Sequence, residues 1–567
     1  MIRIDKKDYL RALLTDTAPA DVPLIFSNDG LYVNLKNKSN ENIKTIFSII
    51  SKKNSTIPYK YKIYKNEVKM RTLSLVHPSS QRNYAEFYND HSHTINYLCS
   101  RSEFSIRAPY KAVNSAYVRN GKRDKPKKYK EFKVETIDTE LGEKHAASYF
   151  AYKGHNRIYK FFQSKKYFEL EKKFKVMWKL DVANCFDSIY THTICWAIKG
   201  KQYTKDNLKK GAQFGDRFDS LLQNSNHSET NGLPIGSEVS RIFSEIIFQR
   251  IDTDIQSDLI DLGLLRRIDY EIIRYVDDFV LFSDSNDSNE IIKNIISSRL
   301  SNYNLYLNEV KLEKYVRPFN TSKSRLINLV NERIGDLEKL LYVKDRDDYF
   351  SVIPNKINRR ERLVFSIVSK IKGDCISVSS GYSDMAPYFI GIISKRVITF
   401  TQKVKVLSLS TKDGMQHNNN IKNVIAAMFD LLFFFYAVSP SVSSSLKVSK
   451  SIIIASDFFC SKLEIHEQFI KSEIMAHVSS LELSLNFSGR HVSLENLNII
   501  SAVANFGDEF LLSSEVFEEI VRHDISYFEI VSLLYYFKDR EVFGVKKVKL
   551  LAKIRLKLNS IGLISAD

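Results

Sequence analysis

The sequence contains few cysteines, and their spacing forms no known pairing motif. The five cysteines, Cys99, Cys185, Cys195, Cys375 and Cys460, lie far apart without a Cys-x-x-Cys pair. This arrangement excludes a zinc-finger type of site and a disulfide framework, and it is typical of a protein in a reducing cytosol. Glycine and proline are also scarce, at 19 and 11 of 567 residues, which argues against a fibrous or disordered chain.

Long hydrophobic runs are nearly absent. The N-terminal stretch MIRIDKKDYLRALLTD lacks the apolar core of a signal peptide. The most apolar run, Val424–Val438, is shorter than the roughly 20 residues of a membrane span, and Asp430 interrupts it. We therefore expect a buried helix here, with a membrane span as the alternative, and a cytoplasmic protein that does not bind a membrane.

Acidic residues are outnumbered by basic ones. Lys and Arg total 84 against 66 Asp and Glu, a formal net charge of +18. Such an excess favours a polyanionic partner, nucleic acid first and an anionic membrane second. The densest basic run spans residues 122–133 and includes Tyr129 and Phe132. Cations with interleaved rings are suited to single-stranded nucleic acid, although a solvated loop has the same composition.

The length allows about three to four domains, and the sequence changes character twice. Residues 1–140 are basic and tyrosine-rich, with strand-like alternation at Tyr61–Val76. Residues 141–320 alternate helical and strand patterns, as in an α+β domain. Residues 321–567 are predicted to be all-α, with a HEAT-like repeat as one option, although no fixed period is visible. The helical segments expected there are Arg359–Lys372, Pro387–Lys403, Ile421–Val438, Ser461–Leu483 and Glu515–Phe537.

Carboxylates stand at the ends of apolar strands in the α+β part. Val176–Leu180 is a predicted buried strand that leads into Asp181, and Tyr270–Phe282 is a predicted hairpin with Asp277 and Asp278 at its turn. Isolated buried carboxylates are costly, so they need a partner. Two Mg²⁺ ions bound by carboxylates from both strands would be such a partner. The simpler alternative is that the aspartates only form a polar turn. Between them, Ser237–Asp252 has the spacing of an amphipathic helix.

These segments resemble three motifs of the reverse transcriptases in their usual order. LDVANCF resembles motif A, GLPIGSEVSRIFSEII resembles motif B, and YVDDF resembles the YxDD box of motif C. The resemblance implies a right-hand polymerase palm with fingers, followed here by the helical domain. It also implies metal ligands at Asp181, Val182, Asp277 and Asp278, with Mg²⁺ as the cofactor and Mn²⁺ as a substitute.

The resemblance extends to residues that would handle the incoming nucleotide. KIYKNEVKMRTLSLVHPSSQ is similar to the fingers motif, which implies that Arg71, with Lys62 and Lys69 behind it, holds the triphosphate. YLNEVKLEK is similar to motif D, which implies that Lys311 protonates the pyrophosphate. Phe186 stands where reverse transcriptases exclude ribonucleotides, so the product should be DNA. Each basic residue could instead be an ordinary surface side chain, and Phe186 a core residue.

Within the reverse transcriptases, the chain resembles the abortive-infection (Abi) and defence-associated enzymes of bacteria. The segments that carry this are KLDVANCFDSIYTHTICWA, NGLPIGSEVSRIFSEIIFQRID and Ser105–Pro109, and the polymerase resemblance covers roughly residues 55–320. The resemblance implies antiphage defence and protein-primed DNA synthesis, in some members without a template. Motif B reads Pro234-Ile235-Gly236 and lacks the usual glutamine, which puts template-directed fidelity in doubt. Gly236 still allows a close backbone approach.

Protein priming requires a hydroxyl that reaches the metal centre, and the sequence selects none. Candidates in the C-terminal half are Tyr342, Tyr349, Tyr382, Tyr388 and Tyr436. The partners expected from the resemblance are dNTPs, a DNA product that can be attached to the protein, an RNA template and further copies of the chain. The alternatives are a conventional reverse transcriptase that copies a partner RNA, an inactive nucleic-acid-binding scaffold and an RNA polymerase.

Overall fold

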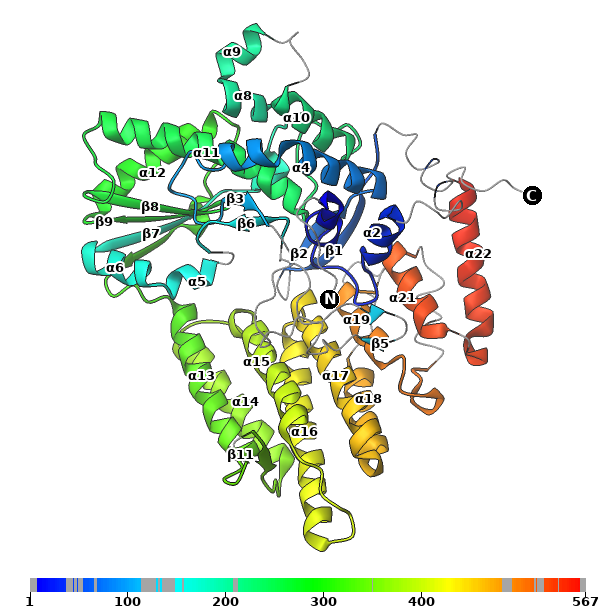
Figure 1. Cartoon of the computed structure of the whole chain (residues 1–567). Helices are drawn as coiled ribbons and strands as arrows, with labels where there is room; N and C mark the ends of the chain where they lie inside the picture. Colours follow the sequence, from blue (N-terminus) through cyan, green and yellow to red (C-terminus); the bar gives the residue numbers. More distant parts are fainter. Residues whose placement is uncertain are drawn as a thin grey trace.

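The structure is a computed structural model with a sheet-containing part and a part built of long helices (Figure 1). It describes residues 8–36, 55–65, 69–113, 148–155, 158–207, 213–348, 350–481, 492–513, 525–538 and 540–560, together with 44, 48, 129–130, 133–134 and 517. The basic run at 122–133 therefore lies almost entirely outside the described residues.

Four antiparallel strands form the central sheet in the order β10–β7–β9–β8. These are β7 (Val176–Asp181), β8 (Tyr270–Tyr275), β9 (Asp278–Ser283) and β10 (Glu313–Val316). Successive residues of a strand point to opposite faces. Trp178 of β7 accordingly joins the core on one side of the sheet and Met177 the core on the other. The predicted strand at Val176–Leu180 and the predicted hairpin at Tyr270–Phe282 are confirmed.

Helices cover both faces of this sheet (Figure 1). One core contains residues of α4 (Pro78–Leu98), α11 (Glu238–Asp261) and α12 (Asn286–Ser301), and the other contains residues of α5 (Ile158–Phe162) and α6 (Lys165–Lys173). α11 begins as predicted, because the hydroxyl of Ser237 accepts the N–H of Ser240 and caps the first turn. Two further helices, α8 (Thr193–Lys199) and α10 (Phe214–Asn224), pack beside α11 and α4.

The strands expected around Tyr61–Val76 form a two-stranded ribbon of β1 (Tyr59–Tyr64) and β2 (Met70–Leu75). Its buried side chains, including Tyr61 and Leu73, join the core of the C-terminal helices. In contrast, α4 joins the core that it shares with α11 and α12, which we call the palm core. Among the described residues before position 140, the ribbon and α4 therefore contribute to different cores.

The C-terminal half is helical, as predicted. Its principal helices are α13 (Ser322–Leu341), α14 (Arg360–Ser377), α15 (Tyr382–Lys403), α16 (Lys412–Val438), α17 (Val442–Lys462), α18 (Glu467–Ser480), α19 (Leu494–Val503), α21 (Tyr527–Phe537) and α22 (Gly544–Ser560). The single helix expected at Ser461–Leu483 is wrong, because α17 ends at Lys462 and α18 starts at Glu467. A short ribbon of β11 (Tyr342–Lys344) and β12 (Val352–Pro354) interrupts the helices.

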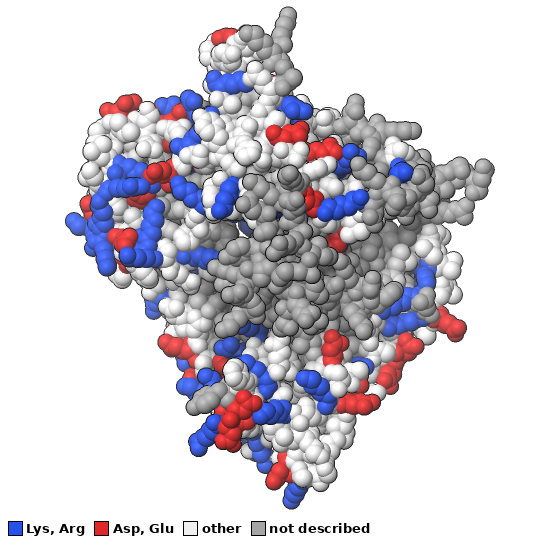
Figure 2. Space-filling view, in the orientation of Figure 1, with Lys and Arg blue, Asp and Glu red and all other residues white. Residues whose placement is uncertain are grey.

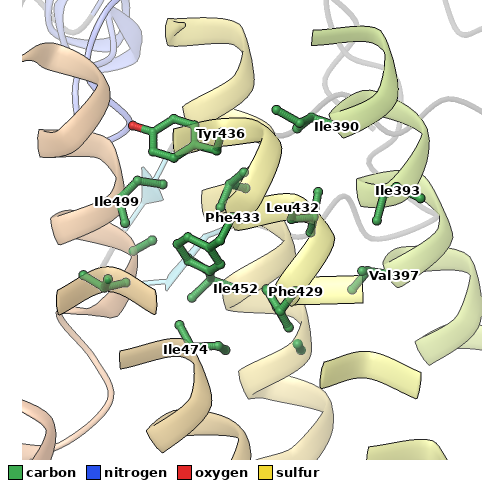
Figure 3. Packing of buried hydrophobic residues seen from close by; sticks show 14 of the residues in the cluster. Ile390, Ile393, Val397, Phe429, Leu432, Phe433, Tyr436, Ile452, Ile474 and Ile499 are labelled. Carbon is green, nitrogen blue, oxygen red and sulfur yellow. The ribbon is translucent and has the colours of Figure 1, made fainter. Parts of the chain in front are cut away.

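The apolar run at Val424–Val438 lies in α16 at the centre of the helical core. Leu432 and Phe433 pack there against α15, α17 and α18 (Figure 3). α16 is the one described helix long and apolar enough to cross a membrane, and 67% of its most apolar window is buried inside the protein. The carboxylate of Asp430 contacts the guanidinium of Arg360 at 3.0 Å and the imidazole of His477 at 3.0 Å. The prediction of a buried helix is confirmed, with a longer extent than expected.

Candidate active site

The sheet brings together three carboxylates that are far apart in the sequence. Asp181, the last residue of β7, lies directly across from Asp278, the first residue of β9. Directly opposed residues of antiparallel strands have Cβ atoms about 4.5–5.5 Å apart and share one face of the sheet. Asp277 occupies the turn immediately before Asp278. The structure therefore groups all three aspartates at one edge of the palm sheet.

The turn between β8 and β9 is strained. Val276 has a φ of +60°, a conformation that is unfavourable for a β-branched residue. The guanidinium of Arg274 donates to the carbonyl of Val276 at 2.9 Å and so holds the turn. Strain of this kind persists only where the surrounding contacts impose it. The position of Asp277 therefore depends on the contacts of Arg274.

Arg274 is fully buried and belongs to an ionic cluster that joins the hairpin to α11. Its guanidinium contacts Asp252 at 2.8 Å and Glu245 at 2.8 Å. The two acids are seven residues apart, and therefore on one face of α11. Sequence reasoning missed this cluster. The available signal was an arginine inside the apolar strand YEIIRYV, because a buried charge requires partners.

The electrostatics of the aspartate cluster favour a cation. Burial raises the pKa of Asp278 to about 7, and the negative charges of Asp277 and Asp181 add to this effect. Burial also raises the pKa of Asp277, with Asp181 again adding to the effect. Carboxylates that repel one another in a half-buried place are stabilised by positive charge. The donor set, all oxygen, is the one that Mg²⁺ prefers.

One cation is already present next to Asp181. The ammonium nitrogen of Lys311, on the short helix η2 (Glu309–Lys311), lies 2.7 Å from Oδ2 of Asp181. The structure thus brings Lys311 to the carboxylates, where the motif D resemblance puts it. Within the described residues, no three His, Cys, Asp or Glu side chains are gathered so as to hold one metal ion. Mg²⁺ sites of enzymes acting on phosphates use one or two carboxylates and complete their shell with substrate and water.

Val182 differs from the other expected metal ligands. Its side chain is apolar and buried in the palm core. Only its main-chain carbonyl has the chemistry of a ligand. The residue follows Asp181 directly and forms an isolated bridge with Leu307.

The β1–β2 ribbon reaches the motif B loop. The N–H of Ser74 on β2 donates to the carbonyl of Ile235 at 2.8 Å. Arg71 lies three residues before Ser74 and pairs with Asp21 at 2.8 Å. Because Arg71 is opposite Ile63 in the ribbon, these two residues share a face, whereas Lys62 lies on the other face. The structure therefore separates Lys62 from Arg71, and Lys69 directly precedes β2, outside the paired register.

The motif B loop, residues 232–237, contains Gly236 and is hydrogen-bonded to Phe186. The carbonyl of Phe186 accepts the N–H of Leu233 at 2.9 Å, and its half-buried ring packs against the palm core. Gly236 has a φ of +126°, and a Cβ there would lie 2.6 Å from Cγ of Pro19. A side chain at position 236 is thus excluded by conformation and by contact. Sequence reasoning missed the N-terminal segment that contains Pro19.

Comparison with known proteins agrees with this geometry. Residues 110–333 match the family model described as "Reverse transcriptase (RNA-dependent DNA polymerase)". That range contains the three aspartates, Phe186, Gly236 and Lys311, whereas the β1–β2 ribbon precedes it. No curated protein matches the chain in sequence.

Solved telomerase structures show a weak likeness. The telomerase from Candida albicans in complex with a TWJ fragment of telomeric RNA is 10% identical, with 84% of this chain and 65% of that chain covered and a TM-score of 0.29. The apo telomerase from Candida tropicalis is 13% identical, with 84% and 76% covered and a TM-score of 0.29. This chain thus spans somewhat less than two thirds of the Candida albicans protein. The family match and the arrangement of aspartates together show that the chain contains a reverse transcriptase domain, the domain of RNA-directed DNA polymerases.

Proposed function

We propose that the chain is an antiphage DNA polymerase that joins dNTPs through a two-metal centre and uses a protein hydroxyl as its primer. The observation that carries the polymerase part is the pairing of Asp181 with Asp278 across β7 and β9, with Asp277 beside them. The ribbon that carries Arg71 is hydrogen-bonded to the motif B loop, and Leu233 of that loop donates to the carbonyl of Phe186, five residues after Asp181. Elements linked through these hydrogen bonds would thus supply the metal ligands and a triphosphate-binding cation.

Asp181, Asp277, Asp278 and the carbonyl of Val182 would hold the metal ions. When bound there, Mg²⁺ supplies activation of the attacking hydroxyl and neutralisation of the triphosphate charge. In the reaction, the hydroxyl loses its proton to water, its oxygen bonds to the α-phosphorus, and the bond from that phosphorus to the bridging oxygen breaks to release pyrophosphate. Lys311, which contacts Asp181, would give a proton to the departing pyrophosphate. Arg71 binds phosphate oxygens through its planar donors.

Phe186 would select the sugar. Its carbonyl accepts the N–H of Leu233, which holds the residue next to the motif B loop, and its half-buried ring packs against the palm core. A bulky ring at this place leaves no room for a 2′-hydroxyl. Deoxynucleotides are therefore the proposed substrates.

The defence role and protein priming rest on the resemblance to the Abi enzymes. Two features support them: Ile235 replaces the usual motif B glutamine, and the helical half shares a core with the ribbon that carries Arg71. Among the tyrosines considered as primers, Tyr342 and Tyr436 are buried, with hydroxyls bonded to Glu338 and Asn496. Tyr388 is 37% exposed, although its hydroxyl donates to Asn331. Tyr382 is half-buried, and Tyr349 lies outside the described residues.

The surface charge is consistent with a nucleic-acid product or template. Lys and Arg side chains gather over α6 and the adjoining sheet (Figure 2). The exposed residues in this region include Lys165, Lys172, Lys173, Lys175 and Arg317. A cluster of cations on one surface attracts a polyanion. We also propose that the protein is cytoplasmic and assembles with further copies of itself.

The test is incubation of the purified protein with Mg²⁺ and labelled dNTPs or rNTPs, without added nucleic acid, beside the Asp277→Ala variant. Denaturing gels run before and after protease treatment show what grows and to what it is attached. We expect label only from dNTPs, no label with the variant, and a mobility shift after proteolysis.

Two other outcomes would change the proposal. Incorporation only after an RNA template and a primer are supplied would favour a conventional reverse transcriptase, which the description of the matching family also suits. No incorporation under any of these conditions would favour a nucleic-acid-binding scaffold.

A further inference from the structure

An N-terminal segment, residues 16–24, runs from the palm to the helical domain, and we name it the strap. Its first residue is anchored in the palm. The carbonyl of Asp16 accepts the N–H of Glu238 at 2.8 Å, at the start of α11. The carboxylate of Asp16 accepts the N–H of Tyr149 at 2.9 Å and the hydroxyl of Ser148 at 2.9 Å. Asp16 itself is 0% exposed.

The other end of the strap is anchored in the helical core. Val22 and Leu24 are 1% and 3% exposed and pack among the residues of that core. The N–H of Leu24 donates to Oδ1 of Asn498 on α19 at 2.7 Å. Displacing either end would break buried hydrogen bonds or expose apolar surface. The strap is therefore a fixed wall and not a lid.

The middle of the strap contacts two residues expected to bind the nucleotide. Pro19 lies against Gly236 of the motif B loop, and Asp21 pairs with Arg71 at 2.8 Å. The backbone of Asp21 is fixed in turn, because the hydroxyl of the buried Tyr61 donates to its carbonyl at 2.6 Å. A carboxylate on a fixed backbone thus holds an arginine whose side chain is 50% exposed.

We propose that Asp21 is a positioning residue that orients Arg71 toward the triphosphate of the incoming nucleotide. This inference rests on the proposed function and deepens it. A guanidinium has five N–H donors, and the contact with Asp21 uses one terminal nitrogen. The remaining donors stay available for phosphate oxygens. A long exposed side chain loses rotamer freedom when it binds a ligand, and prior pairing with Asp21 removes part of that loss.

Glu495 is a second described carboxyl that interacts with this pair, and it is a poorer counter-charge. It is buried on α19, and its Oε1 accepts the N–H of Tyr64 at 3.1 Å. Burial raises its pKa to about 7, with Asp21 adding to this effect and Arg71 opposing it. Glu495 therefore carries only part of a negative charge near neutral pH. Asp21, in direct contact, remains the ion partner of Arg71.

The test compares Asp21→Ala and Asp21→Asn with the wild-type protein by two measurements. The first is the Kd of a fluorescent dNTP in Ca²⁺, and the second is the KM and kcat for dNTP in Mg²⁺. We expect Kd and KM to rise about tenfold, the scale on which supporting partners act, while kcat changes less than about twofold. Asp21→Glu should restore part of the affinity. Exposed ion pairs contribute little to stability, so the melting temperature should change little.

Two controls separate this role from general disruption. Asp374→Ala removes the partner of Arg333, a pair of similar length at 2.8 Å in the helical domain, and should leave nucleotide binding unchanged. Arg71→Ala should raise Kd, and Asp21→Ala should add nothing in that background. An unchanged or lowered Kd for Asp21→Ala would overturn the inference, and a lowered value would show that Asp21 competes with phosphate. Because Ca²⁺-dependent binding needs no turnover, its outcome is independent of the Asp277→Ala test of the polymerase activity.

Discussion

The ammonium nitrogen of Lys311 lies 2.7 Å from Oδ2 of Asp181 and provides positive charge to the aspartate cluster. The side chain of Lys311 is about half exposed, at 52%. It is free to turn from the carboxylate toward a bound substrate. The same residue can therefore balance the charge of Asp181 before the nucleotide binds and serve as an acid afterwards.

Replacing Lys311 with methionine should lower kcat by about 100-fold, the lower range for loss of a general acid. Nucleotide affinity should change much less, because phosphate binding is assigned to Arg71. Single-turnover incorporation measured over a range of pH would check this. Lys314→Met is the control, because Lys314 is a lysine on β10 whose ammonium nitrogen lies 3.9 Å from the centre of the Trp178 ring. Equal losses for the two variants would refute a specific role for Lys311.

Replacing Arg274 with methionine should destabilise the palm by about 3–5 kcal/mol, because Glu245 and Asp252 would remain as uncompensated buried charges. Polymerase activity should fall as well, since the carbonyl of Val276 loses its donor. Thermal melts and incorporation assays would measure the two effects.

A triple variant separates the effect of Arg274 on protein stability from its effect on the geometry of the β8–β9 turn. Arg274→Met combined with Glu245→Gln and Asp252→Asn removes all the buried charge and should recover much of the stability. Activity should stay low, because the turn that carries Asp277 is still without its anchor. Full recovery of activity in the triple variant would show that Arg274 acts through stability alone.

The sequence predicted the catalytic strands because their signals are local. Asp181 and Asp277 each adjoin an apolar strand, and the spacing of α11 is helical, so both can be recognised within a short window. The contacts that fix these elements are not local. Arg274 meets Asp252 and Asp21 meets Arg71 only after the chain has folded, and neither pair is separated by a helical or strand interval.

The packing of the β1–β2 ribbon is another non-local feature that a short window of sequence does not reveal. Alternation identified the β1–β2 ribbon, but a pattern of buried residues does not state which core receives them. Tyr61 and Leu73 pack with the C-terminal helices, hundreds of residues away in sequence. Lys62 and Arg71 were grouped by motif, whereas the register of the ribbon puts them on opposite faces.

Replacing Phe186 with alanine should weaken discrimination against ribonucleotides by about tenfold or more, while dNTPs remain substrates. The reason is steric, because the residue is hydrogen-bonded to the motif B loop and removal of its ring would make room for a 2′-hydroxyl. The ratio of kcat/KM for a dNTP and the matching rNTP measures this selectivity. Phe214→Ala is the control, since Phe214 is a half-buried ring that packs against the same core on α10. Unchanged selectivity in Phe186→Ala would mean that the ring is only a core residue.

Replacing Asp16 with asparagine should stabilise the protein at alkaline pH and have little effect at acidic pH. Burial raises the pKa of Asp16 from 3.8 to about 7, and the negative charge of Glu238 adds to this effect. Because the folded-state pKa exceeds the unfolded one, the wild-type protein loses stability as pH rises from about 4 to about 7, and the neutral amide does not. A shift of this size corresponds to on the order of 4 kcal/mol.

Asparagine can keep the hydrogen bonds that anchor the strap at position 16. In the wild-type protein the N–H of Tyr149 and the hydroxyl of Ser148 donate to different oxygens of the Asp16 carboxylate. In the variant, the amide oxygen can accept the N–H of Tyr149, and the NH₂ group can donate to the hydroxyl of Ser148. Thermal melts at pH 5, 7 and 8 should therefore show a difference between variant and wild type that grows with pH and levels off above about pH 7. A difference that is constant across this range would mean that the carboxyl does not titrate there. A destabilised variant at every pH would instead show that the charge of Asp16 is required to hold the strap on α11.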